Sequence, residues 1–226
     1  MKIGFFGDSF SAENPPKFFY KYRTYISLLE QEYKINIPIY SRGGTSHWDL
    51  IINQFLPNID NLPDICIFTW PDENRFFHRT VRNIRRQEAL GYSQEQYKLL
   101  KISYNFGLYK NEWTAAEMFY HYLFDKEKNE IEYKSSLHYF DNVIIDKLKD
   151  KKFIHLWSFN QKHEWKNNIE LNEPLIKIAE RMIPNYHPAP GQGDNENYLA
   201  PNHLPGQELN NYVFEKVKGL IDEINR

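Results

Sequence analysis

Cysteine is nearly absent from this sequence: its 226 residues include one, Cys66, so a disulfide bond within the chain is excluded. Cys66 lies in an apolar run, and we expect it to be a small buried residue of the core. Long apolar runs are missing as well. No stretch approaches the ~18 residues typical of a membrane-spanning helix, and no apolar core of a signal peptide follows Met1 and Lys2. We therefore expect no membrane association and a cytoplasmic location.

The sequence also has little excess charge of either sign. It has 28 lysine and arginine residues against 30 aspartate and glutamate residues, which gives a formal net charge of -2. This balance argues against a nucleic-acid partner. Glycine patterns that cradle phosphate groups are missing, and the 8 histidines lack the spacing of a zinc site. The sequence thus predicts neither a metal nor another cofactor.

A candidate nucleophile lies near the beginning of the sequence. Residues 2–6 form an apolar run that predicts a strand, and Gly7-Asp8-Ser9 follows it directly. In an open α/β sheet, ligands bind at the carboxyl ends of strands, so a serine on this turn can act as a nucleophile if a base reaches it. The N–H groups around Ser9 can also stabilise an oxyanion. On the tripeptide alone, a loop with helix-capping residues is the simpler interpretation.

A candidate base lies near the other end of the sequence. His203 is in a loop before a segment whose apolar residues, from Leu209 to Ile221, recur at helical spacing. In a doubly wound sheet this loop is well placed to reach the end of the first strand. General-base catalysis requires His203 to lie within hydrogen-bonding reach of Ser9. The alternative is a loop histidine that caps or packs on the last helix.

Two further strand ends carry hydrogen-bond donors. Residues 35–40 predict a second strand that runs into Gly43-Gly44, where the backbone can approach a ligand closely. Residues 64–70 predict a third, buried strand, followed by Asn74. The glycine N–H groups and the Asn74 amide are candidate oxyanion donors. Four strand-end loops that carry serine, glycine, asparagine and histidine in this order are far more specific than any one of them.

In these blocks the sequence resembles the SGNH (GDSL-type) hydrolase family. The matching blocks are 7–9, 43–46 and 202–204. The resemblance implies an α/β fold, with a three-layer α/β/α flavodoxin-like parallel sheet. It also implies Ser9 as nucleophile and His203 as general base. The implied oxyanion hole consists of the N–H group of Ser9, a glycine N–H from Gly44 or Gly43, and the side chain of Asn74.

Two positions depart from the family pattern. The third block is usually Gly-x-Asn-Asp, whereas Asn74 is displaced within 69–74 of this sequence. The histidine block usually has an aspartate three residues before the histidine, and this sequence has Ala200 there. Asp194, Glu196 or a backbone carbonyl could orient His203 instead. A Ser–His dyad, or a member of the family that has lost activity, would also fit this sequence.

The rest of the pattern fits one domain over residues 1–226, because no repeat or low-complexity segment divides it. Residues 152–159 predict a fourth strand, and 184–201 an irregular loop. The helical block at about 76–150 is long for one crossover. We expect an insertion there, which forms a lid over the strand ends or packs on the flank or on another copy. Predicted helices cover residues 18–32, 48–55, 76–90, 94–104, 113–124, 137–149 and the last segment, and residues 172–182 predict either a helix or a mixed element.

Arginine and aromatic residues suggest features of the substrate. Arg75, Arg79, Arg82 and Arg86 share one helical face, which can bind an anionic group or be a solvated face paired with acids. The aromatic residues within 76–120 can form a platform for sugar rings or fill a core. Core packing and a solvated face are the more common outcomes.

The sequence predicts a serine esterase that hydrolyses, or transfers, a small acyl ester on a carbohydrate. Ser9 would attack the ester carbonyl, His203 would take the proton, and water would release the acid from an acyl-enzyme. The expected partner is a small-molecule or glycan ester. A catalytically degenerate binding or structural module is the main alternative. A protein that binds a phosphorylated ligand through the arginine row is a weaker one.

Overall fold

The computed structural model describes residues 1–12, 22–43, 45–73, 75, 118–159, 163–166, 169–184, 186 and 203–225. A parallel sheet lies at its centre, with the strand order β1-β2-β3-β4 within these residues. The strands are β1 (Ile3–Gly7), β2 (Ile65–Trp70), β3 (Lys152–Trp157) and β4 (Ile169–Glu170). The apolar runs at 2–6, 64–70 and 152–159 predicted the first three correctly.

The predicted strand at 35–40 is reduced to a single bridge, in which Ile39 pairs in parallel with Phe5. Phe5 donates its N–H group to Pro38 O at 3.1 Å, and Tyr40 donates to Phe5 O at 2.8 Å. Pro38 lacks an N–H group and so interrupts a regular ladder. With this segment on the far side of β1 from β2, the sheet has the order 2-1-3-4-5 of flavodoxin-like folds.

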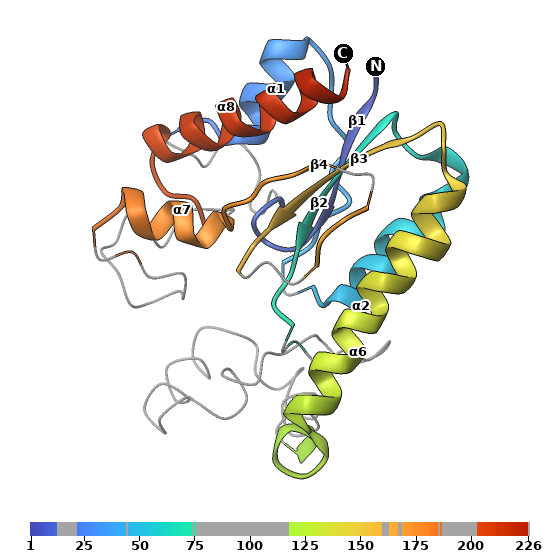
Figure 1. The fold of residues 1–226 in the computed structure, drawn as a ribbon. Helices are drawn as coiled ribbons and strands as arrows, with labels where there is room; N and C mark the ends of the chain where they lie inside the picture. The colour runs from blue at the N-terminus through green and yellow to red at the C-terminus, as the bar shows by residue number, and fades with distance from the viewer. Residues whose placement is uncertain are drawn as a thin grey trace, which may run out of the picture.

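Helices cover both faces of the sheet (Figure 1). One face packs against α1 (Tyr25–Tyr33), α7 (Leu175–Met182) and α8 (Gln207–Ile224). The strands contribute to this core the side chains of Ile3, Phe5, Ile65, Ile67, Ile154 and Leu156. Because side chains alternate along a strand, the residues between them face the opposite side.

The opposite face carries Phe6, Cys66, Phe68, Trp70, Phe153 and Trp157. It packs against the continuous helical segment α2 (His47–Asp49), η2 (Leu50–Phe55) and η3 (Leu56–Asn61), and against α6 (Lys126–Tyr139) with η5 (Phe140–Ile144) and η6 (Ile145–Lys147). The predicted helix at 48–55 is part of the first segment. Two helical layers around a parallel sheet confirm the predicted α/β fold class.

Two helices begin where a side chain caps them. The Thr24 hydroxyl accepts a hydrogen bond from the N–H group of Ser27, so α1 begins at Tyr25 and not at 18. Asp125 accepts from the N–H group of Lys128 at 2.7 Å, so α6 begins eleven residues before the predicted helix at 137–149. Apolar spacing located α1, whereas at α6 it found only the last residues and the η5 and η6 segments, because the first turns of α6 are mostly charged.

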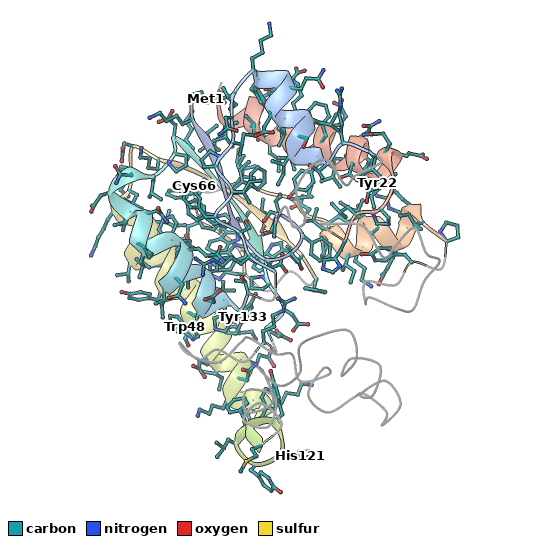
Figure 2. The ribbon with its side chains drawn as sticks, turned by 180° about the vertical axis from the view of Figure 1, so that it is seen from behind. Met1, Tyr22, Trp48, Cys66, His121 and Tyr133 are labelled. Atoms are coloured by element: carbon teal, nitrogen blue, oxygen red, sulfur yellow. The ribbon has the colours of Figure 1, made fainter. Side chains whose placement is uncertain are left out.

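The described part of the 76–150 block consists of residues 118–150. Residues 76–117, to which the predicted lid belongs, lie outside the described residues. η4 (Phe119–Leu123) precedes α6. Tyr133 and Leu137 of α6 are buried against the sheet layer, whereas His121 lies at the far end of this helical column from Cys66 (Figure 2). Residues 126–147 thus form the crossover that covers one face between β2 and β3.

The remaining elements are the short strand β4 and the helix α7. β4 has only two residues, paired with Ile154 and His155 of β3, and the sequence pattern missed it. The segment at 172–182, for which a helix or a mixed element was predicted, contains the helix α7, which begins after Pro174. A proline is compatible with a helix N-terminus because that N–H group needs no partner. Within the described part of the chain, no helix has the length and apolar character to cross a membrane.

Candidate active site

Ser9 lies at the point where the strand order of the sheet reverses. β1 ends at Gly7, and Asp8 donates its N–H group to Thr69 of β2, with O at 3.3 Å and Oγ1 at 3.2 Å. Ser9 is half-buried, whereas nearby Ser11 is fully buried with its Oγ against those of Ser41 and Thr69. Ser9 is therefore the serine of this turn that a ligand can reach, in the crevice where open α/β sheets bind ligands.

Gly7 is required by the close approach of β1 and β2. Its φ is +145°, and a β-carbon at this position would lie 2.1 Å from Thr69 Oγ1 and 2.3 Å from Thr69 O. Both atoms belong to a strand that cannot move away, so any larger residue would displace the turn. This packing explains why a glycine comes two residues before Ser9.

Gln54 holds the open side of β1. Its Oε1 accepts the Gly7 N–H group at 2.7 Å, and its Nε2 donates to Gly7 O at 3.0 Å. Nε2 also donates to Thr45 Oγ1 at 3.0 Å, which ties the turn to the glycine loop at 41–45. The buried amide thus supplies the missing acceptor for the Gly7 N–H group, while Gly7 O also accepts the backbone N–H group of Arg42 at 3.0 Å. Sequence analysis missed Gln54; a polar residue between Ile51 and Phe55 on a buried helical face was the available signal.

Asp8 stabilises the turn around Ser9 from within. Its side chain is fully buried, and Oδ1 accepts hydrogen bonds from the N–H group of Phe10 at 3.0 Å and from Ser158 Oγ at 2.8 Å. The first bond closes the turn around Ser9. The second fixes the turn to the residue that follows β3.

The structure brings Ser9 and His203 together: Nε2 of His203 lies 2.8 Å from Ser9 Oγ. The imidazole ring also packs on Phe10, with ring centroids 5.1 Å apart. The backbone of His203 has a φ of +56°, in the left-handed region that non-glycine residues seldom adopt. The pair is separated by 194 positions in the sequence, and the loop before α8 makes the approach that its position predicted.

Of the candidate oxyanion donors, the structure describes Ser9 and Gly43. A β-carbon added to Gly43 would lie 4.0 Å from Ser9 Cβ, so Gly43 is next to the serine, and its backbone is exposed. Gly44 and Asn74 lie outside the described residues, as do Ala200, Asp194 and Glu196. The group that orients the other ring nitrogen of His203 therefore stays an open prediction.

Arg75 differs from both interpretations of the arginine row. It is 4% exposed, and its guanidinium group donates to Thr45 O at 3.0 Å. Arg75 is thus neither a solvated surface residue nor simply a group directed at a ligand: it supports the glycine loop from behind. Arg79, Arg82 and Arg86 lie outside the described residues, as do the aromatic residues at 76–117.

The histidines within the described residues do not form a metal site. No group of three or more described histidine, cysteine, aspartate or glutamate residues is arranged to hold a metal ion. Burial lowers the pKa of His47 to about 3 and that of His155 well below its ordinary value, so both rings are neutral. His155 accepts a hydrogen bond from Trp70 Nε1 at 2.9 Å on Nδ1. Both side chains are buried in the interior of the protein.

Comparison with known proteins gives little further information. The sequence matches no protein-family model and no curated protein. Among solved structures, an acetyl xylan esterase from the rumen bacterium Butyrivibrio proteoclasticus is similar, with a TM-score of 0.35 and 11% sequence identity. The match covers 70% of this chain and 46% of that one. At this level of similarity it bears on neither family membership nor activity.

Proposed function

We propose that the protein is a serine esterase of the SGNH type, with Ser9 as nucleophile and His203 as general base. The contact of 2.8 Å between Ser9 Oγ and His203 Nε2 carries this proposal. A hydroxyl oxygen becomes an effective nucleophile when a neutral imidazole accepts its proton. The pair lies at a strand end, on a turn held by buried groups, where a substrate can enter.

In the proposed reaction, Ser9 Oγ attacks the ester carbonyl carbon while its proton passes to His203 Nε2. The tetrahedral intermediate then expels the alcohol, which takes that proton from His203, and an acyl-serine remains. A water molecule, deprotonated by His203, repeats the attack; the carboxylic acid leaves and Ser9 recovers its proton. Attack by a sugar hydroxyl in place of water would transfer the acyl group instead.

We place the oxyanion of the intermediate against the N–H groups of Ser9 and of Gly43 or Gly44, with Asn74 as a further donor. Support comes from the position of Gly43 next to Ser9 and from the bonds that hold its loop. Thr45 Oγ1 donates to Arg42 O at 2.8 Å, and Arg75 holds Thr45 O. A loop fixed in this way keeps its N–H groups in position without reorganisation during the reaction.

The substrate that we propose is a small acyl ester on a carbohydrate. This rests on the family resemblance of the sequence blocks. Acetylated sugars and acetylated oligosaccharides are the first substrates to assay, with 4-nitrophenyl acetate as a general ester probe.

The deciding experiment is labelling with a fluorophosphonate, followed by peptide mapping, on the wild type, Ser9→Ala and His203→Ala. The expected result is one adduct per chain on Ser9, lost in the first variant and strongly slowed in the second. Ser135→Ala and His138→Ala, both at exposed positions of α6, are matched controls that should label like the wild type. A folded wild type without an adduct on Ser9 would exclude the mechanism.

The alternative is a binding module that has kept the fold without turnover. Ala200, at the place of the expected aspartate, favours it, because a missing orienting acid can lower the rate by orders of magnitude. In that case acetylated sugars should raise the Tm of the wild type although Ser9 is not labelled. Under the esterase proposal, Ser9 is labelled and product accumulates.

A further inference from the structure

The loop that carries His203 is held by side chains through its backbone carbonyl groups. Tyr186 donates its hydroxyl to His203 O at 2.7 Å. Asn210 of α8 donates to Leu204 O at 2.6 Å and to Gly206 O at 2.8 Å. Tyr186 is 8% exposed and Asn210 is fully buried, so these bonds are protected from exchange with water.

The backbone conformation of His203 requires such support. A non-glycine residue at a φ of +56° is strained, and such a residue keeps its conformation only where its surroundings determine it. The next side chain, Leu204, is fully buried in the core around α1, α7 and α8. The peptide group between His203 and Leu204 is therefore held at two places. Apolar packing anchors the Leu204 side chain, and the Tyr186 hydroxyl anchors the carbonyl group of His203.

The imidazole ring itself touches the nucleophile turn. Phe10 supports one side of the ring, and Asp8 in turn holds the N–H group of Phe10. The position of Nε2 relative to Ser9 thus depends on contacts at the ring and on contacts at the backbone. Tyr186 supplies one of the backbone contacts from the segment that follows α7, independently of the nucleophile turn.

We propose that Tyr186 is a positioning residue of the reaction: its hydroxyl, bound to His203 O, keeps the left-handed backbone that directs Nε2 at Ser9. This inference rests on the proposed function. It assigns to a tyrosine and a backbone carbonyl part of the orienting task for which the sequence has no aspartate at position 200. Asn210 has a wider role, because it also accepts the N–H group of Tyr25 at 3.0 Å and joins α1 to α8.

The test is Tyr186→Phe, which removes the hydroxyl alone. Misplacing a catalytic group by a fraction of an ångström slows the chemical step, so kcat for 4-nitrophenyl acetate should fall by about tenfold or more. KM should stay within about twofold, because the ester is bound by other groups. Fluorophosphonate labelling of Ser9 should slow by the same factor as kcat. A loss of stability alone would lower the active fraction without changing the labelling rate of the folded molecules.

Tyr33→Phe is the matched control. Its hydroxyl donates to Asp222 Oδ1 at 2.9 Å, near the C-terminal ends of α1 and α8, whereas His203 precedes the N-terminus of α8. This variant loses one tyrosine hydrogen bond, and its kcat and labelling rate should equal those of the wild type. If the wild type labels and Tyr186→Phe reacts at the wild-type rate, the inference about Tyr186 is wrong and the proposed function stands. If the wild type does not label, the proposed function fails first.

Discussion

Asp8 and Ser158 are separated by 150 positions in the sequence, yet Ser158 Oγ lies 2.8 Å from Asp8 Oδ1 in the interior of the protein. The bond joins the turn that carries Ser9 to the end of β3. Since the same oxygen accepts the N–H group of Phe10, one carboxylate holds both the shape of the turn and its place on the sheet. The position of Ser9 therefore depends on a buried carboxylate beneath the turn.

Replacing Asp8 by alanine should destabilise the protein strongly. The change leaves the buried Ser158 hydroxyl and the Phe10 N–H group without this acceptor, at a cost of about 2–4 kcal/mol in the free energy of unfolding. Urea unfolding measures this loss. Asp146→Ala removes an exposed carboxylate bound to Lys149, and it should have little effect. Equal midpoints for Asp8→Ala and the wild type would contradict the role given to Asp8.

Gly7→Ala should be among the most damaging single substitutions in the chain. The added methyl group would lie against the Thr69 backbone at a φ of +145°, so we expect a loss of about 3 kcal/mol or more. Gly219→Ala is the matched control, because a β-carbon at this position of α8 meets nothing within 4 Å. In a helix interior that change should stabilise by about 0.5–1 kcal/mol. Thermal unfolding of the two variants should shift Tm in opposite directions.

Gln54→Leu tests whether a side-chain amide supplies the acceptor for the Gly7 N–H group. Leucine fills a similar volume but leaves the buried Gly7 N–H group without its acceptor, whereas Gly7 O keeps the N–H group of Arg42; we expect a cost of about 1–3 kcal/mol. Hydrogen exchange should show faster exchange of the Gly7 amide, and fluorophosphonate labelling of Ser9 should slow. Gln31→Leu, at an exposed position of α1, should change neither. Unaltered protection of Gly7 in Gln54→Leu would refute the bracing role.

The comparison of sequence and structure separates two kinds of information. Apolar runs located β1, β2 and β3, and strand ends are where parallel sheets bring polar groups together. These patterns placed Ser9 after the first strand and His203 in a loop before the last helix, whereas the distance between the two side chains required the structure. The pattern at 35–40 overstated its strand, since Pro38 leaves a bridge at Ile39. The two residues of β4 are too short for any periodic signal.

The supporting residues could not be predicted in this way. Gln54 and Ser158 are polar residues inside apolar segments, and their partners Gly7 and Asp8 lie 47 and 150 positions away. Apolar neighbours such as Ile51 and Phe55 can indicate that Gln54 is buried, but nothing local identifies the distant group that either residue binds. Tyr186 belongs to the same group, since its bond to His203 depends on how α7 and α8 pack. The strands and the turn that carries Ser9 were thus predictable from local patterns, whereas the groups that hold this turn and the His203 loop required the fold.

The buried neutral His47 predicts how stability depends on pH. Burial lowers its pKa in the folded protein to about 3, while an unfolded histidine titrates at about 6.5. Below about pH 6.5 the unfolded chain therefore binds a proton that the folded protein does not. The stabilisation is complete above that pH and is lost as the pH falls toward 3, at about 1.4 kcal/mol per pH unit. His155, whose pKa is also lowered by burial, adds to the same slope.

His47→Phe should remove the contribution of one titrating group from the pH dependence of the free energy of unfolding. Among the described residues, neither ring nitrogen of His47 has a hydrogen-bond partner, and the ring meets Tyr133 edge-on, with centroids 4.7 Å apart, so a phenyl ring preserves the packing. Between pH 6 and pH 4, urea unfolding of the variant should show a slope smaller by about 1.4 kcal/mol per pH unit. His138→Phe, on the exposed face of α6, should keep the wild-type slope. An unchanged slope in His47→Phe would mean that this ring does not enter the folded protein as the neutral form.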